Sequence, residues 1–217
     1  MRLDDLTSEY DRLQRQYGAP GLDPIYSGGC EHNPDLCFVF MNPTGRNIAS
    51  SKEWKGLKAP WIGTKTIWGL FYRLGLLDED VHERIQRRSP GDWTEEFAAG
   101  VYANVEAHRY FITNLGKCTQ SDARPLPDSV YREYLSLLEQ ELAIIRPKAV
   151  VLFGNQVSSV VLGRKISVSQ YRKTPCEKTI GGETVRFFPV YYPVGNGRFH
   201  MDKSIEDIRW ILDTQLC

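Results

Sequence analysis

The sequence lacks the features that would place it in several broad classes of protein. No run approaches the ~18 consecutive apolar residues needed to cross a bilayer, so no membrane association is expected. Residues 1–18 are charged throughout and have no apolar centre, which argues against a secretory signal peptide. There is also no internal repeat and no low-complexity tract. The chain is therefore expected to be globular.

The five cysteines form no pattern that indicates a disulfide framework or a metal site. Their number is odd, their spacing is irregular, and no Cys-X-X-Cys pair occurs, which argues against structural zinc. Reduced thiols in a cytoplasmic protein are expected.

An excess of positive charge is also missing. Lys and Arg together number 27, as do Asp and Glu, so the formal net charge is zero. The overall charge gives no support to nucleic-acid binding, but a local basic face would be enough for it. Lysines gather between residues 52 and 65, and basic residues recur between 164 and 178. Either group is equally consistent with ordinary solvated surface.

What the sequence does contain is an alternation of apolar runs and helical periodicities. Runs with apolar residues on both faces are typical of strands in a parallel sheet covered by helices, and four are present: residues 36–41, 109–115, 148–154 and 185–193. Helical periodicity occupies residues 3–17, 64–77, 93–106, 127–145, 156–163 and 201–216. This order predicts an α/β fold, a three-layer α/β/α sandwich with a central, mainly parallel four-stranded sheet. We expect one domain over residues 1–217, of which residues 1–30 are an N-terminal helix and a connection.

The carboxyl ends of the four predicted strands are polar, and ligands bind at such ends in open parallel sheets. Asn42 ends the first strand, and Pro43 disfavours helical geometry there, so the amide can orient a water or a substrate carbonyl. Asn114 ends the second strand, and its donors and acceptor suit the edge of a pyrimidine. The alternatives are a simple turn at Asn42 and a buried strand cap at Asn114.

Two aromatic loops follow the same logic. Trp61 lies between Pro60 and Gly63 and can stack on a base, although it is equally suited to a core or lid position. After the last strand, the glycines of residues 195–197 permit close backbone approach. Arg198 and Phe199 then supply a cation and an apolar wedge of the kind that opens a duplex. The alternative is a connecting loop in which Phe199 is tucked under the last helix.

Taken in order, these motifs resemble the uracil-DNA glycosylase superfamily over roughly residues 36–214. "FMNPTG" is similar to the first motif of the mismatch-specific and single-strand-selective branches, Gly-(Ile/Met)-Asn-Pro-Gly. Three stretches resemble segments of the iron–sulfur branch: "APWIGTKTIWGLFYRLGLL", "YFITNLGKCTQSDARPLP" and "IRPKAVVLFGNQVSSVVLG". "VYYPVGN" falls where the family carries His-Pro-Ser or His-Pro-Ala.

The resemblance implies a role for each matching position. Asn42 would position the hydrolytic water, with Tyr192 as the second catalytic residue. Met41, Trp61 and Asn114 would contact the base, Trp61 by stacking and Asn114 by reading its polar edge. The DNA backbone would be held, and the helix wedged open, by Thr44, Arg46, Gly154, Asn155, Gln156, Gly195, Asn196, Arg198 and Phe199.

The sequence departs from the family at three points. Cys118 matches one cysteine of the iron–sulfur branch, but its partner position is Tyr134, and Cys30 and Cys37 have the wrong spacing for another pair. A cluster needs its thiolates, so we expect no iron–sulfur cluster, no metal and no cofactor. The usual histidine of the last motif is Tyr192, a neutral phenol. Met41 and Thr44 stand where the family has small residues.

The resemblance implies a monofunctional hydrolase of base excision repair, expected to be monomeric, with damaged DNA as its partner. It would flip out uracil or another damaged or modified pyrimidine and hydrolyse the N-glycosidic bond. Two alternatives remain open. One is a glycosylase specialised for a bulky, hypermodified base, as in defence against phage. The other is an inactive DNA-binding protein on the same scaffold.

Overall fold

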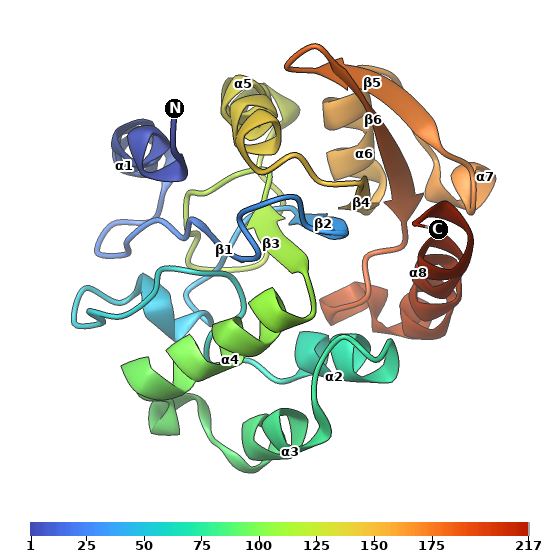
Figure 1. The fold of residues 1–217 in the computed structure, drawn as a ribbon. Coiled ribbons are helices and arrows are strands. Elements are labelled where there is room, and N and C mark those ends of the chain that lie inside the picture. Colours follow the sequence, from blue (N-terminus) through green and yellow to red (C-terminus); the bar gives the residue numbers. More distant parts are fainter. Residues whose placement is uncertain (217) are drawn as a thin grey trace.

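A six-stranded sheet forms the centre of the molecule, in the order β1-β3-β2-β4-β6-β5 (Figure 1). The computed structural model describes residues 1–216, apart from the side chain of Asn196. The strands are β1 (Ser27–Gly29), β2 (Leu36–Phe40), β3 (Tyr110–Asn114), β4 (Ala149–Phe153), β5 (Cys176–Ile180) and β6 (Glu183–Val190). The predicted α/β class is confirmed.

The four predicted strands are the middle of this sheet. β3, β2, β4 and β6 run parallel to their neighbours, whereas β1 and β5 pair antiparallel with β3 and β6 at the two edges. The predicted number of four strands is therefore wrong. β1 is a three-residue Ser-Gly-Gly segment without a side-chain signal, and β5 has exposed residues in its middle, as is common at an edge.

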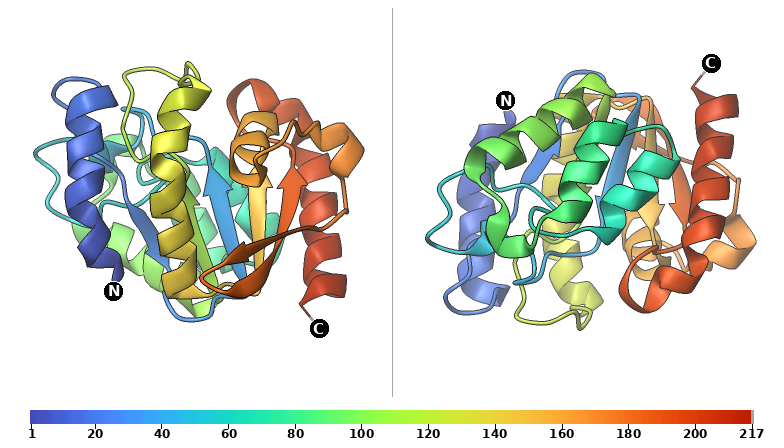
Figure 2. Two further views of the ribbon diagram at one scale, coloured as in Figure 1. Left: turned by 90° about the horizontal axis from the view of Figure 1, so that it is seen from above. Right: turned by 90° about the horizontal axis from the view of Figure 1, so that it is seen from below.

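Helices cover both faces of the sheet, as the two views of Figure 2 show. On one face lie α1 (Thr7–Tyr17), α5 (Asp128–Ile145) and α6 (Asn155–Leu162). On the other lie α2 (Thr66–Arg73), α3 (Glu79–Arg87), α4 (Glu95–Ala107) and α8 (Met201–Gln215). The short α7 (Val168–Tyr171) precedes β5, and 3-10 turns occupy Leu3–Leu6, Ile48–Ser50, Pro90–Asp92 and Gly195–His200.

The strands divide their side chains between two apolar clusters because successive residues point to opposite faces. In β2, Phe38 and Phe40 pack under α2 and α4, while Cys37 and Val39 pack under α1 and α5. Every residue of β2, β3 and β4 is buried, so these strands form a rigid platform. Their carboxyl ends are thereby held in fixed positions relative to one another.

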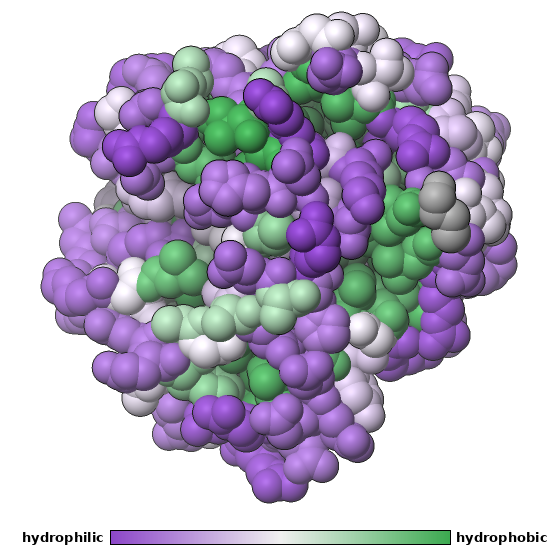
Figure 3. Space-filling view, viewed as in Figure 1, coloured by the Kyte–Doolittle hydropathy of each residue, from purple (hydrophilic) through white to green (hydrophobic). Residues whose placement is uncertain are grey.

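The surface seen in Figure 3 is mainly hydrophilic, and its apolar side chains gather in separate small patches. Among the helices of residues 1–216, none combines the length and the hydropathy needed to cross a bilayer.

Candidate active site

A cavity of about 210 Å³ lies at the carboxyl ends of the central strands. It forms there because β2 and β3 are parallel and paired, with Phe40 opposite Asn114, so their polar ends emerge side by side. Of the residues predicted from the sequence, these line it: Asn42, Thr44, Arg46, Trp61, Asn114, Tyr192 and Gly195. Segments far apart in the sequence therefore meet in one pocket.

The amide of Asn42 is held at the end of β2 by two hydrogen bonds. Its Oδ1 accepts a 2.6 Å bond from the hydroxyl of Tyr131, and its Nδ2 donates a 3.1 Å bond to the carbonyl of Pro43. Tyr131 is a fully buried residue of α5 on the opposite side of the sheet from α2. These two bonds fix the orientation of the Asn42 amide, and Asn42 lines the cavity.

Asn114, at the end of β3, is 2% exposed. Its Nδ2 is buried and has no hydrogen-bond partner among the described residues. Leaving a buried donor unpaired costs ~1–3 kcal/mol, and buried polar groups are seldom left so. A ligand acceptor reaching this end of the cavity would complete the missing bond.

Trp61 occupies a strained turn at the wall of the cavity. Its φ is +69°, a left-handed value that a bulky residue rarely adopts. Its carbonyl oxygen accepts bonds from the Thr64 amide at 3.1 Å, the Thr64 hydroxyl at 2.7 Å and Trp68 Nε1 at 3.2 Å. The indole meets Phe40 edge-on, with centroids 4.9 Å apart. Strain maintained by converging bonds is common at functional sites.

Tyr192 closes the cavity from the end of β6. Its ring lies edge-on to Phe40 with centroids 6.3 Å apart. Burial raises the pKa of the Tyr192 phenol above its ordinary value, so the group is a neutral hydrogen-bond donor. The loop that follows packs tightly against it, since a Cβ on Gly197 would clash with the Tyr192 carbonyl oxygen. The expected close backbone approach is confirmed at Gly197.

Phe199 is 78% exposed at the end of this loop, within the 3-10 turn Gly195–His200. The Arg198 guanidinium lies 4.9 Å from its ring centroid. The alternative in which Phe199 is tucked under α8 is therefore wrong. The prediction for Asn196 concerns a side chain outside the described part of the structure.

Some predicted residues lie elsewhere. Met41 packs with the cluster under α1 and α5, on the face of the sheet away from the cavity. Gln156 Nε2 donates to Leu126 O at 2.9 Å and to Asp128 Oδ1 at 2.8 Å, while Asn155 Oδ1 accepts from the Val168 amide at 2.9 Å. These two side chains join α6 to its neighbours. Gly154 and the first amides of α6 remain at the strand end, where backbone donors can face an anion.

Asn47 lines the cavity and was not predicted. It is 4% exposed, donates to Ala59 O at 2.8 Å and accepts from the Ala49 amide at 3.1 Å. It thereby ties the loop after Asn42 to the loop that carries Trp61. A buried asparagine in a polar loop gives no sequence signal that distinguishes this role from an ordinary turn.

The described cysteines do not fit an iron–sulfur cluster. Cys30, Cys37, Cys118 and Cys176 are buried and free of disulfides, and Cys118 Sγ lies 3.7 Å from Gln120 Nε2. Within residues 1–216, no three His, Cys, Asp or Glu side chains form a group that could hold a metal ion. The expected absence of a cluster stays a prediction.

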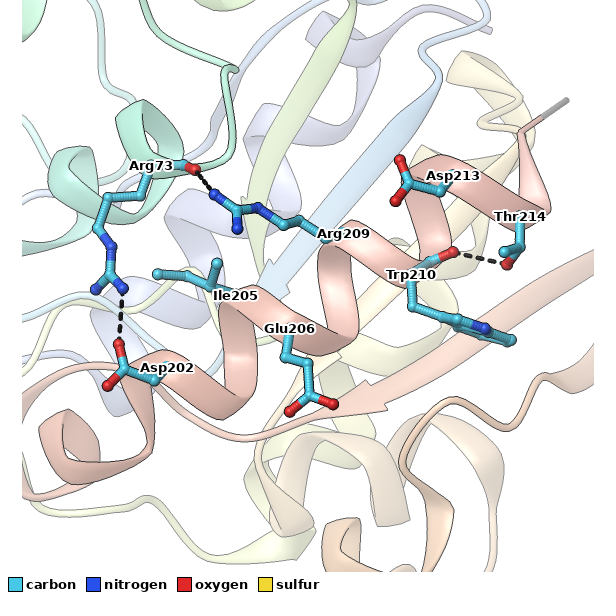
Figure 4. Close-up of a pocket in the computed structure, with 8 residues that line it drawn as sticks. All are labelled: Arg73, Asp202, Ile205, Glu206, Arg209, Trp210, Asp213 and Thr214. Atoms are coloured by element: carbon cyan, nitrogen blue, oxygen red, sulfur yellow. Dashed lines mark hydrogen bonds and ion pairs between the residues drawn. The ribbon is translucent and has the colours of Figure 1, made fainter.

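A larger depression of about 400 Å³ lies beside α2 and α8 (Figure 4). Several of its charged groups already have partners: Arg73 pairs with Asp202 at 2.7 Å, and Arg209 donates to the Arg73 carbonyl at 2.7 Å. None of its lining residues lines the cavity at the strand ends. The smaller cavity is therefore the candidate functional site.

A model of the Uracil DNA glycosylase superfamily matches residues 28–212. The match includes every strand from β2 to β6 and all residues that line the cavity. The chain therefore belongs to the uracil-DNA glycosylase superfamily, whose members are hydrolytic DNA glycosylases of base excision repair. A search among curated proteins found no match.

Proposed function

We propose that this protein is a DNA glycosylase that hydrolyses the N-glycosidic bond of uracil or another damaged or modified pyrimidine. The observation that carries the proposal is the cavity in which Asn42, Trp61, Asn114 and Tyr192 meet. Drug-sized ligands occupy pockets of ~300–1,000 Å³, so about 210 Å³ suits a single base. A base buried in a duplex reaches such a cavity only after its nucleotide has been flipped out.

Recognition of the base falls to Trp61 and Asn114. The indole supplies an apolar face at the cavity wall, and base–aromatic stacking is worth ~1–3 kcal/mol. The buried Nδ2 of Asn114 has no hydrogen-bond partner, and a carbonyl oxygen of uracil could accept a hydrogen bond from it. Cytosine presents an amino donor on its 4-position, and that group would leave Nδ2 unpaired. This argument supports an oxidised or deaminated pyrimidine edge.

Catalysis is assigned to Asn42 and Tyr192. As the glycosidic bond breaks, positive charge develops on the sugar and the base departs as an anion. The neutral phenol of Tyr192 can donate a hydrogen bond to an oxygen of the leaving base, which stabilises developing charge without an ionic group. Asn42 Oδ1 retains a lone pair with which to orient the water that attacks the sugar.

The rim of the cavity supplies charge for the DNA backbone. Arg46 lines the cavity, and Arg198 stands beside the exposed Phe199. Within the described part of the chain, neither of these two cations is paired with a carboxylate. Phosphate contacts of this kind supply much of the affinity for DNA. A local basic rim of this kind is compatible with the zero net charge of the whole protein.

A substrate panel tests the proposal. Oligonucleotides carrying uracil, hypoxanthine or modified cytosines, single- and double-stranded, are incubated with the wild-type protein, and abasic sites are cleaved with alkali. We expect cleavage of the uracil strand and its loss in Asn42→Ala. Cleavage confined to modified cytosines would favour the specialised enzyme instead. Tight binding to uracil DNA with no cleavage of any substrate would reject the enzymatic function in favour of a DNA-binding protein.

A further inference from the structure

Tyr131 links helix α5 to the residue that faces the scissile bond. It is 0% exposed, and its hydroxyl lies 2.6 Å from Asn42 Oδ1 across 89 positions of sequence. It lies outside the cavity lining, so it cannot touch the base or the sugar. Any effect it has on the reaction must pass through Asn42.

The chemistry of the two contacts fixes which way the Asn42 amide points. The Pro43 carbonyl can only accept a hydrogen bond, so the atom of Asn42 that lies 3.1 Å away must be Nδ2. Oδ1 then faces Tyr131, whose hydroxyl must be the donor. The reversed amide would set two acceptors against each other at Pro43. The Pro43 carbonyl therefore decides which atom faces Tyr131, and the Tyr131 hydroxyl holds Oδ1 in that place.

Packing leaves the pair little freedom. Gly116 lies beside both residues and donates a 2.8 Å bond to the Met41 carbonyl. A Cβ at Gly116 would stand 3.2 Å from Tyr131 Cε1 and 3.5 Å from Asn42 Cβ. The end of β2, the loop after β3 and the first turn of α5 thus converge on one point without spare room. Burial, the largest influence on the phenol, also raises the pKa of Tyr131, which keeps its proton in place.

We infer that Tyr131 is a positioning residue that holds Oδ1 of Asn42 toward the hydrolytic water. The inference rests on the proposed glycosylase function and adds to it a specific requirement for the Tyr131 hydroxyl. With one lone pair of Oδ1 occupied by Tyr131, the other is directed to the cavity, and the amide is polarised rather than free to rotate. Preorganisation of this kind lowers the barrier by removing the cost of orienting the group during the reaction.

Tyr131→Phe removes only the hydroxyl, and the chain offers a matched control. Tyr134 is three residues further along α5 and is also 0% exposed, and its buried hydroxyl makes no hydrogen bond to the described residues. We expect Tyr131→Phe to lower kcat on the best substrate of the panel on the order of 10-fold with KM unchanged, because the lost interaction acts in the transition state. Tyr134→Phe should stay within about 2-fold of wild type, as for a core change without a link to the site.

A double variant tests whether the effect passes through Asn42. If it does, Tyr131→Phe adds no further loss of activity to Asn42→Ala, since coupled residues are not additive. Additive losses, or equal losses in Tyr131→Phe and Tyr134→Phe, would overturn the inference. Gly116→Ala perturbs the same pair from a third side and should lower kcat in the same direction.

A second readout does not require turnover. The side-chain amide of Asn42 gives a pair of signals in a nitrogen–proton correlation spectrum, assigned by their absence in Asn42→Ala. These signals should shift and exchange faster with solvent in Tyr131→Phe, and remain as in wild type in Tyr134→Phe. Unchanged signals in Tyr131→Phe overturn the inference even for an active enzyme. Shifted signals in a protein that cleaves no substrate would instead reject the glycosylase function while preserving the structural link.

Discussion

The ammonium of Lys117 lies 3.0 Å from the carboxylate of Glu141, and each side chain is 1% exposed. Thr113 completes the group, since its hydroxyl donates to Glu141 Oε2 at 2.7 Å and accepts a bond from Lys117. Burial lowers the pKa of Lys117, and Glu141 opposes that shift. Lys117 lies in the loop after β3, three residues beyond Asn114, and Glu141 lies in α5. The ion pair therefore joins this loop to α5.

Removal of one partner of this pair should be far more damaging than removal of both. Lys117→Met leaves the Glu141 carboxylate buried and uncompensated, and we expect the free energy of unfolding to fall by ~3–5 kcal/mol. A variant that combines Lys117→Met with Glu141→Leu should recover most of that loss, because no isolated charge remains. Urea denaturation at neutral pH measures both.

A surface pair provides the comparison. Glu9 and Arg12 pair at 2.8 Å, but each side chain is 49% exposed. Glu9→Gln should change the free energy of unfolding by less than ~1 kcal/mol. Similar losses in Glu9→Gln and Lys117→Met would show that burial does not govern the Lys117 pair.

Strain at Trp61 gives a prediction that separates stability from function. At φ +69° an alanine is as strained as the tryptophan but packs less well, whereas glycine adopts this conformation freely. Trp61→Gly should therefore be more stable than Trp61→Ala by ~1 kcal/mol, although both lose the indole that lines the cavity. Thermal unfolding of the two variants, side by side, tests the difference, and the reverse order would exclude a strained turn.

With Tyr192 at this position, the cleavage rate should depend on pH differently than it would with a histidine there. Because burial raises its pKa above the ordinary value of ~10, the phenol stays protonated through the alkaline range. The cleavage rate should show no loss attributable to this group between roughly pH 7 and 9.5. A Tyr192→His variant would place a group that titrates near ~6.5 at the same position, and its rate should change across that pH.

The contrary result for Tyr192 is well defined. A fall in wild-type rate centred below pH 10, and abolished by Tyr192→Phe, would show that the phenol ionises despite its burial. Single-turnover rates across the range, on one uracil oligonucleotide, separate this from changes in product release.

Glu206 links stability to acid pH. The basic side chains of Lys173 and Arg172, at 2.6 and 2.9 Å, lower the pKa of Glu206 to about 2. A lowered pKa in the folded state means stability that is complete above the unfolded value of ~4.3 and is lost as pH falls toward 2. Glu206→Gln should therefore lower the melting temperature at pH 7, and the difference from wild type should shrink below roughly pH 4. A difference independent of pH would exclude the carboxylate as its source.

The central strands were predictable because burial on both faces leaves a strong signal in a short run. β2, with five apolar residues in succession, carries that signal fully. β1 does not, because Ser27, Gly28 and Gly29 join the sheet through backbone bonds alone. An edge strand of this kind is defined by the partner it pairs with, which the local sequence does not contain.

The cavity was predictable to the extent that its residues follow strand ends. Asn42 and Asn114 stand out as polar residues after apolar runs, and topology then brings them together. Tyr131 does not stand out, because a tyrosine at an apolar position of a helix is expected to be an ordinary residue of the hydrophobic core. Met41 shows the opposite failure, since its side chain packs into the cluster under α1 and α5 and does not line the cavity.

Phe199 should matter for duplex DNA and for little else. With 78% of its surface exposed, its removal costs the fold almost nothing, and Phe199→Ala should change the free energy of unfolding by less than ~0.5 kcal/mol. A wedge offsets the cost of unstacking a base, which is a few kcal/mol in a duplex and least in a single strand. The variant should therefore cleave double-stranded uracil DNA at least ~10-fold more slowly while single-stranded cleavage stays near wild type.

Leu57→Ala, at another large exposed apolar residue (38% exposed), is the matched control and should affect neither substrate. Equal losses on both substrates in Phe199→Ala would assign the side chain to the base site instead of the helix.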